Sequence, residues 1–587
     1  MLESTFPSRL VVADFEFRPR EGLEGNPIEV ICGCFKVYNS SESATLWHDE
    51  LYSLTSPPFF DELGVTLVAF FAPAELACFR ALGWSTDVPV IDLYAEFRIL
   101  SNGLELPGGR SLLGALQYFG RPGLNIAHKE AMRQLALRGE PYTDKERASL
   151  LAYCAEDVEM TLSLLSVMVN LIDVPRALLR GRFCSAIADM ETHGTPIDLA
   201  TLDRLRSNWA AIKDLLTVQW DRAFQVYEDG HFKEELFEAY LLRQQIAWPR
   251  HPSGRLKLDD DTFKDMGRVH PQVKPLRYLR ECLSKLRFGS IQVGQDGRNR
   301  CMLSPFGAST GRNTPSSSRF IFGWPKWARG LIQPKPGRSL CYIDYSQQEF
   351  GIAAALSGDT NMIAAYRSGD PYLQFAIQAG AVPKDATKGS HPNERAQFKA
   401  CVLAVQYGMG EDSLALRIGE PVIRARQLLN HHRRVYRRFW EWSDAVFNSA
   451  VASNELHTIY GWRLQLKPDL NPRSIRNFPM QATAAEMLRV ACILIREQGI
   501  DLCAPIHDAI LIEADDALIH KHSTIAQQCM TQASGVVLGG FELSSDLTTL
   551  TYPDRFLDND AEPFWTEMID LLKKVETQSV KTLTPSR

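Results

Sequence analysis

The sequence predicts a protein of mixed α/β and α+β class, with a smaller N-terminal α/β unit followed by a larger α+β unit. Three observations support this prediction. Strand-like and helix-like patterns alternate through residues 1–170, residues 176–290 are mainly helical, and strand patterns beyond residue 338 are separated by long helical patterns. A chain of 587 residues has room for three or more structural units, or for two of which one is large.

The individual elements follow from local composition. In the N-terminal unit, apolar and β-branched runs predict strands at residues 9–17, 28–38 and 65–71. A long helix is expected over residues 145–170. Residues 293–338 are rich in Gly, Pro, Ser and Asn, which predicts loops and short turns. Two later segments predict strands, SLCYIDYS and PIHDAILIEA, and FWTEMIDLLKKV predicts one helix near the end of the chain.

The charge distribution is more informative than the net charge of −6. Residues 281–340 hold only two acids and ten bases, which are Lys285, Arg287, Arg298, Arg300, Arg312, Arg319, Lys326, Arg329, Lys335 and Arg338. Residues 421–440 hold no acid and six bases, which are Arg424, Arg426, Arg433, Arg434, Arg437 and Arg438. Such tracts either follow a phosphate backbone or form solvated helix faces, and both interpretations stay open.

The chain is expected in the cytoplasm. Its first residues show no basic segment followed by an apolar run, and no stretch approaches the roughly 18 apolar residues of a membrane span. The 12 cysteines are scattered, as expected of small buried side chains in a reducing compartment. Cys32 and Cys34 form a lone C-x-C, for which two strand cysteines are a better interpretation than a zinc site.

Two carboxylates occupy the first predicted strand. Asp14 and Glu16 are two residues apart, so in a strand they face the same side. Because buried neighbouring carboxylates need a positive partner, a divalent metal is the expected ligand. Tyr153 and Asp157 lie four apart in the predicted long helix and therefore share one of its faces.

Together, in this order, the D-x-E and Y-x-x-x-D segments resemble the DnaQ-like 3′–5′ exonucleases, which have an RNase H-like fold. The resemblance implies hydrolysis assisted by two Mg²⁺ ions, with Asp14, Glu16 and Asp157 as ligands and Tyr153 orienting a water. Glu75 is the candidate for the family's intermediate aspartate, and a solvated acid at a helix start is the alternative. Phe71 replaces the asparagine that usually precedes that aspartate, which puts the exonuclease rate in doubt.

Three further segments carry a second constellation. Asp344 ends an apolar strand pattern, and Asp508 follows His507 at a predicted tight turn between two strands. Between them, four residues recur every four positions along a predicted helix and place two cations and then an aromatic on one stripe, so that a triphosphate could lie against the cations. These residues are Arg395, Lys399, Leu403 and Tyr407.

These segments resemble motifs A, B and C of the family A DNA polymerases. Motif A corresponds to DYSQQE at residues 344–349, motif B to Arg395, Lys399 and Tyr407-Gly408, and motif C to His507-Asp508. The segments STGR at 309–312, NFPMQ at 477–481 and DMETHGTPID at 189–198 also occur in the family's order. The likeness covers most of residues 1–550. Asp344 and Asp508 are about 160 residues apart in the sequence, and only this resemblance links them in one site.

The resemblance implies a role for each residue. Asp344, Asp508 and the Tyr345 carbonyl would hold two Mg²⁺ ions, with Mn²⁺ as an alternative at either site, and Lys399 would act in catalysis. The triphosphate and sugar would be bound by Arg395, Glu349, Leu403, Tyr407, Tyr372 and Gln347. Primer–template DNA would be bound by Arg312, Asn477, Gln481, His507 and Arg473.

Three positions depart from the family pattern. Leu403 stands where an aromatic ring usually packs against the nucleotide sugar, which predicts altered handling of dideoxynucleotides. Ala509 replaces an acid that often follows His-Asp, and Tyr372 stands where many members have a histidine. We expect the two principal aspartates to remain sufficient ligands.

The resulting domain prediction is an exonuclease domain at 1–175 and a right-hand polymerase domain at 176–587. The thumb is expected near 200–295, the fingers near 355–465, and the palm in the remainder. Expected partners are primer–template DNA, dNTPs and a processivity factor or other replisome protein, with the chain itself a monomer. The absence of a 5′-nuclease-like segment, together with Leu403, predicts a phage or prophage origin.

Three other functions were weighed. A single-subunit RNA polymerase is disfavoured by Glu349, because a ribose 2′-hydroxyl needs a small residue there. An exonuclease with a DNA-binding clamp is disfavoured by the presence of Asp344, Lys399 and Asp508. A non-enzymatic replisome scaffold, whose catalytic sites have lost their function, is an alternative that remains open only for the exonuclease half of the chain.

Overall fold

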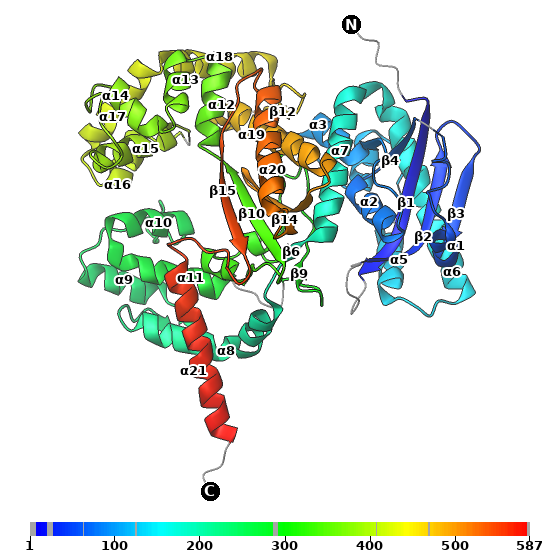
Figure 1. Ribbon diagram of the computed structural model, residues 1–587, viewed down its shortest axis with the longest axis horizontal. Helices are drawn as coiled ribbons and strands as arrows, with labels where there is room; N and C mark the ends of the chain where they lie inside the picture. Colours follow the sequence, from blue (N-terminus) through cyan, green and yellow to red (C-terminus); the bar gives the residue numbers. More distant parts are fainter. Residues whose placement is uncertain are drawn as a thin grey trace.

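The computed structural model describes residues 7–19, 28–62, 64–123, 126–285, 291–406, 408–467 and 470–583. Its architecture is the predicted mixture of α/β and α+β units, with the N-terminal sheet on one side of the molecule and the larger unit on the other (Figure 1). The predicted helix at 145–170 is α6 (Asp144–Met168), which begins with a capping box formed by Thr143 and Glu146.

The N-terminal unit is built on a five-stranded sheet in the order β3-β2-β1-β4-β5. Its strands are β1 (Arg9–Pro19), β2 (Ile28–Val37), β3 (Ser43–Trp47), β4 (Val65–Ala69) and β5 (Val90–Asp92). β1 pairs antiparallel with β2 and parallel with β4, so the sheet is mixed. Its helices are α1 (His48–Ser53), α2 (Ala72–Ala81), α3 (Leu93–Ser101), α4 (Leu112–Tyr118), α5 (Ile126–Arg138) and α6. Cys32 and Cys34 are buried on β2, as strand cysteines would be.

Helix α7 (Val174–His193) joins the two units. It packs against β5 and α2 on one side and against β13 (Asp501–Ile506) on the other. The approach to β5 is close enough that a Cβ on Gly181 would lie 2.0 Å from the Val90 carbonyl oxygen, so a larger residue does not fit. One continuous hydrophobic core consequently includes Val11 of the first unit and Ile343 of the second.

A four-stranded antiparallel sheet, the palm, forms the centre of the larger unit. Its order is β13-β14-β10-β15, with β10 (Arg338–Tyr345), β14 (Ala509–Asp515) and β15 (Ser545–Thr551). Helices α19 (Pro472–Glu497) and α20 (Ile519–Val537) pack on each other, and α20 also packs on β10 and β14. β15 was not expected from the sequence.

Two helical lobes extend from the palm (Figure 1). The thumb comprises α8 (Leu199–Asp221), α9 (Glu234–Arg243), α10 (Asp260–Val269) and α11 (Lys274–Lys285). The fingers comprise α12 (Gln348–Ser357), α13 (Thr360–Arg367), α14 (Pro371–Gln378), α15 (Pro392–Gln406), α16 (Glu411–Ile418), α17 (Val422–Val435) and α18 (Arg437–Ser453). The lobes meet where α10 contacts α16.

The remaining elements are short, and those within residues 293–338 agree with the loops and short turns expected there. Small paired strands are β6 (Thr195–Pro196) with β9 (Arg298–Asn299), β7 (Tyr227–Glu228) with β8 (His231–Phe232), and β11 (Glu455–His457) with β12 (Arg463–Gln465). The 3₁₀ helices are η1 (Val169–Leu171), η2 (Pro271–Val273), η3 (Ile321–Gly323) and η4 (Lys326–Leu331).

The predicted C-terminal helix is α21 (Glu562–Leu583), and it packs along α8 of the thumb. Arg204 of α8 forms an ion pair of 2.7 Å with Glu576, and Trp220 of α8 donates a hydrogen bond to Glu567. The C-terminal helix, which the sequence prediction assigned to the palm, therefore packs against both α8 of the thumb lobe and the segment Lys326–Leu331.

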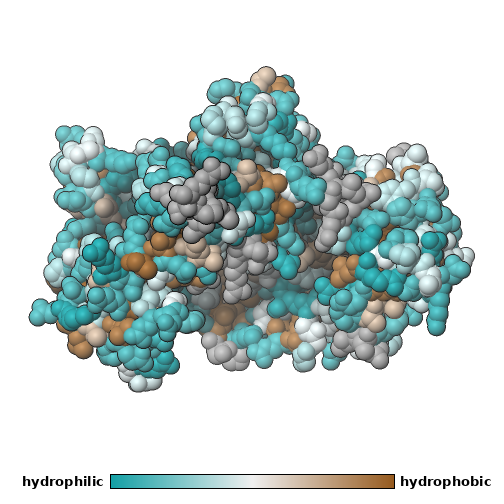
Figure 2. All heavy atoms as spheres, turned by 90° about the horizontal axis from the view of Figure 1, so that it is seen from below, coloured by the Kyte–Doolittle hydropathy of each residue, from teal (hydrophilic) through white to brown (hydrophobic). Residues whose placement is uncertain are grey.

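Within the described residues, α19 is the one helix long and apolar enough to cross a membrane by length and composition, and 83% of its most apolar window is buried inside the protein. The molecular face in Figure 2 is mainly hydrophilic and carries small, separate hydrophobic patches.

Candidate active sites

The first candidate site is an acidic cluster in the N-terminal unit. Asp14 and Glu16 lie on β1, and α6 brings Asp157 against that strand. One carboxylate oxygen from each of the three residues lies within 4.8 Å of the other two. Glu75 is a helix-start acid in the first turn of α2, but it is buried rather than solvated, with 4% of its surface exposed.

These carboxyl groups perturb one another. Burial raises the pKa of Glu16 to about 8, with Asp157 adding to the shift. Burial also raises the pKa of Asp14 well above its usual range, assisted by Glu75, Asp157 and Glu16. The pKa of Glu75 is raised in the same way, first by burial and then by Glu16 and Asp157. Without added positive charge, four neighbouring carboxylates are therefore held partly protonated.

The cluster fits divalent metal ions. Buried oxygens of Glu75 and Asp157, Oε2 and Oδ1, have no hydrogen-bond partner. One cation, Lys129 of α5, lies 4.0 Å from the Asp157 carboxylate and partly offsets the acidic charge. Oxygen donors with unmet electrostatic demand form the kind of set that Mg²⁺ and Mn²⁺ prefer.

Tyr153 lies one helical turn before Asp157 on α6, as the spacing predicted. Its side chain is buried, and the pKa of its hydroxyl is raised first by burial and then by the Asp157 charge. Phe71, the departure from the family pattern, adopts a left-handed backbone with φ of 74° before α2. Its N–H donates a 2.8 Å hydrogen bond to Asp92, and its ring packs 5.4 Å from the ring of Tyr94.

The second candidate site is a pair of aspartates at one end of the palm sheet. Asp344 lies near the end of β10, and Asp508 lies in the tight turn between β13 and β14, as predicted. His507 makes this turn possible by adopting a left-handed φ of 54°. The Tyr345 N–H donates a 3.3 Å hydrogen bond to the Asp508 carbonyl, which fixes the turn against β10.

The electrostatics of this pair are those of two acids competing for one proton. Burial raises the pKa of Asp344 to about 7, and the charges of Asp508 and Asp546 add to the shift. The pKa of Asp508 is also raised by burial. The Asp344 Oδ1 atom is buried without a hydrogen-bond partner. The Tyr345 hydroxyl donates to the Met530 carbonyl, so only the Tyr345 backbone carbonyl is left to act as a ligand.

A cationic group occupies the fingers. The Arg395 guanidinium and the Lys399 ammonium of α15 lie 5.6 and 5.5 Å from the centre of the Tyr372 ring on α14. Arg395 donates to Asp370, the N-cap of α14. Leu403 is half-buried one turn beyond Lys399, and Tyr407 lies outside the described residues. Within the described residues, no ion pair joins Arg395 or Lys399 to the palm aspartates.

Glu349 links the nucleotide and DNA candidates. It lies in the first turn of α12, and its carboxylate is 3.7 Å from the Arg312 guanidinium. Burial raises the pKa of Glu349, while Arg312 opposes the shift. Gln347 is the N-cap of α12 and adopts a left-handed φ of 47°.

The predicted DNA contacts fall on three elements. Arg312 and His507 line one cavity of about 370 Å³ between the 311–323 loop, α19 and the turn before β14. Asn477, Gln481 and Arg473 lie on α19. Arg473 packs next to Gly408, where an added Cβ would lie 2.8 Å from its side chain, so α19 contacts the end of motif B.

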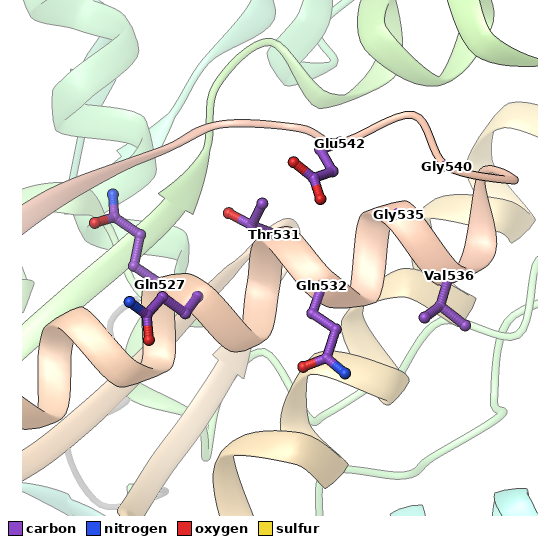
Figure 3. A pocket seen from close by; sticks show the side chains of 8 residues that line it. Gln527, Thr531, Gln532, Gly535, Val536, Gly540 and Glu542 are labelled. Carbon is purple, nitrogen blue, oxygen red and sulfur yellow. The ribbon is translucent and has the colours of Figure 1, made fainter.

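Sequence reasoning missed Asp546, Asp370 and Lys129. Asp370 precedes Pro371, and an Asp-Pro pair is a recognisable helix start. Asp546 had no such signal, because the strand around it was not predicted. A different pocket lies on α20 beside the loop at Gly540 and Glu542 (Figure 3), and its lining includes none of the predicted site residues.

Comparison with known proteins defines the class. The profile of DNA polymerase family A matches residues 316–545, which include Asp344, the fingers and Asp508. This part of the chain is similar to the family A DNA polymerases.

Individual relatives agree with this assignment. The chain is 25% identical over 377 residues to the thermostable DNA polymerase I of Thermus thermophilus, covering 59% of this chain and 44% of that protein. It is 25% identical over 410 residues to the DNA polymerase of Mycobacterium phage D29, covering 66% of each chain. The chain thus spans less than half the length of the Thermus relative.

A solved structure extends the similarity in fold. The POL domain of Pol1 from M. smegmatis, in complex with DNA primer-template and dNTP, matches with a TM-score of 0.69 at 17% identity. The match covers 91% of this chain and 94% of that one. Because the N-terminal unit is larger than the unmatched 9%, part of it lies within the matched fold.

Proposed function

We propose that this chain is a DNA-directed DNA polymerase that extends a primer 3′ end with dNTPs on a DNA template. The observation that carries the proposal is the Asp344–Asp508 pair. Asp344 lies opposite Ala509, the residue after Asp508, in the pairing of β10 with β14, and its Oδ1 atom is buried without a hydrogen-bond partner. The match of residues 316–545 to the profile of DNA polymerase family A supports it. The Mycobacterium phage D29 relative supports a phage or prophage source.

Asp344, Asp508 and the Tyr345 carbonyl would hold the metal ions, two Mg²⁺ at this site. Bound divalent ions would activate the attacking oxygen and neutralise the leaving group, here and at the N-terminal cluster. The protein's own part is to keep both carboxylates on rigid strands and a tight turn, so that no reorganisation is needed on binding.

The incoming triphosphate would lie against α15. Arg395 presents a planar fork of donors that suits phosphate oxygens, and its contact with Asp370 fixes the direction of that fork. Lys399 supplies a mobile charge one turn further along, where it can donate a proton to the departing phosphate. Tyr372 supports both cations through its ring face and could add a hydroxyl contact.

Sugar selection would depend on Glu349. Its half-buried carboxylate next to Arg312 would crowd the C2′ position and exclude a ribose hydroxyl. Leu403 would border the sugar. Tyr407, which lies outside the described residues, and Gln347 are the other nucleotide-binding candidates that the sequence offers. Arg312, His507, Asn477, Gln481 and Arg473 would bind the primer–template.

We further propose that residues 1–175 form a 3′–5′ exonuclease domain. The supporting observation is the convergence of Asp14, Glu16 and Asp157 within 4.8 Å, together with the buried and unpartnered Glu75 oxygen. Two metal ions would bind there, and the Tyr153 hydroxyl would orient the attacking water. The alternative is a structural domain in which Phe71 and Glu75 have silenced hydrolysis.

The polymerase proposal is tested by incorporation of single nucleotides onto a 5′-labelled primer annealed to templates that differ in one base. We expect only the complementary dNTP to be added, only with Mg²⁺, and expect the isosteric variant Asp508→Asn to lose the reaction. Failure of the wild-type protein to add any nucleotide contradicts the proposal.

The exonuclease proposal is tested separately with a 5′-labelled single strand and no dNTPs. Stepwise shortening from the 3′ end should require Mg²⁺ and vanish in Asp157→Asn. If no shortening occurs while the same preparation extends primers, the N-terminal unit is a structural domain.

A further inference from the structure

The loop that carries Arg312 is held in an unfavourable backbone conformation. Ser304 and Phe306 adopt left-handed φ angles of 49° and 59°, which non-glycine residues rarely do. The loop then closes a tight turn, with the Gly311 N–H bonded to the Ala308 carbonyl at 2.9 Å. A segment in this state persists only where its surroundings over-determine it.

The main support comes from Arg98 on α3 of the N-terminal unit. Its guanidinium donates to the carbonyls of Phe306 and Gly307 at 2.9 Å and to that of Ala308 at 3.2 Å. Only 1% of Arg98 is exposed, and burial lowers its pKa to about 10, so the side chain is still charged. Within the described residues Arg98 has no carboxylate in ion-pair range, so the loop carbonyls are what stabilise this charge.

Asn102, just beyond α3, extends the same support. Its amide donates at 2.6 Å to the Ser309 carbonyl and at 2.6 Å to the Arg463 carbonyl of β12. From within the larger unit, Trp462 also donates to Ser309, and Arg489 of α19 donates to Gly311 at 2.8 Å. Five backbone carbonyls just before Arg312 therefore accept side-chain hydrogen bonds. Four of these five accept from a residue on α3 or at its end.

Helix α3 also reaches the acidic cluster. It begins at its N-cap Asp92, which accepts the Phe71 N–H and whose charge contributes to the raised pKa of Glu75. One short helix thus has its first turn at the proposed exonuclease site and its end at the loop of the proposed polymerase site.

We propose that Arg98 and Asn102 are positioning residues of the polymerase site, supplied by the N-terminal unit, which set the Arg312 loop for primer–template binding. This inference rests on the proposed polymerase function. Because neither residue contacts the palm aspartates or the fingers cations in the structure, their loss should weaken DNA binding and leave the chemical step intact.

The test uses full-length variants and a labelled primer–template. Arg98→Met removes all three hydrogen bonds, and Arg98→Lys keeps the charge while losing the fork that spans the three carbonyls. Glu96→Gln is the matched control, because Glu96 ties α3 to Arg180 of α7 through a buried ion pair that does not touch the loop. Fluorescence anisotropy gives the DNA Kd, and single-turnover extension at saturating DNA gives the chemical rate.

We expect Arg98→Met to raise the DNA Kd by about tenfold, Arg98→Lys to raise it less, and both to keep the chemical rate within about twofold. In a protein that already carries Arg312→Ala, Arg98→Met should raise the DNA Kd by less than about a further twofold, because both changes remove the same DNA contact. Equal Kd increases for Arg98→Met and Glu96→Gln at equal loss of Tm would overturn the inference, as would additive effects with Arg312→Ala. Failure of the polymerase proposal is distinguishable, because the wild-type protein would then extend no primer.

Discussion

Asp344 on β10 lies directly opposite Asp546 on β15, so the two carboxylates share one face of the palm sheet. On its other side Asp344 lies opposite Ala509, which replaces the acid that often follows His-Asp in the family. The Ser346 hydroxyl donates a 2.8 Å hydrogen bond to Asp546, which orients this additional charge.

The first prediction concerns this neighbour. Asp546→Asn removes a negative charge beside the proposed metal ligands and should raise the Mg²⁺ concentration for half-maximal extension by about fivefold, as expected for roughly 1 kcal/mol. At saturating Mg²⁺ the rate should recover. The measurement is a Mg²⁺ titration of extension rate, with Ser346→Ala as a milder control. An unchanged Mg²⁺ dependence would show that Asp546 is electrostatically irrelevant.

The second prediction is a dependence of stability on pH and metal. The pKa values of Glu16 and Asp344 are raised to about 8 and about 7, so their neutral forms are favoured in the folded protein. Their contribution to the free energy of unfolding is complete at pH values below their pKa in the unfolded chain. It is lost as the pH rises through their pKa in the folded protein. Metal-free protein should therefore melt at a lower temperature near pH 8.5 than near pH 6.

Added Mg²⁺ should reverse this loss, because the ions bind the ionised carboxylates. The increase in Tm on adding Mg²⁺ should accordingly be larger near pH 8.5 than near pH 6. Thermal melts with EDTA or Mg²⁺ at the two pH values measure it. The double variant Asp14→Asn, Asp344→Asn is the control, and an identical increment at both pH values in the wild-type protein counts against the metal sites.

The third prediction concerns Glu75. Glu75→Gln should lower 3′–5′ shortening by about a hundredfold or more, because an oxygen ligand becomes a neutral amide. Extension should change by less than about twofold. The same variant should raise the metal-free Tm near pH 8.5, since it removes a buried group whose ionisation is unfavourable. Full shortening activity in this variant would remove Glu75 from the site.

The fourth prediction concerns Leu403. Replacing it by Phe restores a ring beside the nucleotide sugar and should change the ratio of ddNTP to dNTP incorporation by about two- to tenfold. Competition assays on one template position give this ratio for both proteins. Phe398→Leu, a buried change on the same helix, controls for loosened packing. Equal ratios for wild type and Leu403→Phe would refute the idea.

Local sequence signals were sufficient for the residues that terminate strands or begin helices. Asp344 and Asp508 were placed correctly because a carboxylate after an apolar strand and a His-Asp turn are both local features. Helix α6 was placed correctly from the helical pattern of residues 145–170, and the structure shows that Thr143 and Glu146 form its capping box. The pairing of the two aspartates needed the family resemblance, because about 160 residues separate Asp344 from Asp508 and only the pairing of β10 with β14 brings them together.

Long-range contacts account for what the sequence did not reveal. Asp546 lies on a mostly exposed strand, SDLTTLT, which lacks the apolar alternation of a half-buried strand. Arg98 is a buried charge whose partners are backbone carbonyls 208 to 210 residues away. The position of α21 against α8 depends on tertiary packing, which a helical pattern alone does not specify.

The most direct test of the two-site account follows one 5′-labelled primer with and without dNTPs in wild type, Asp344→Asn, Asp14→Asn and the double variant. The account predicts that Asp344→Asn shortens the primer but never extends it, that Asp14→Asn extends but never shortens it, and that the double variant does neither. If either single variant loses both activities, or keeps the activity assigned to the changed residue, the assignment of separate chemistry to the two acidic sites is contradicted.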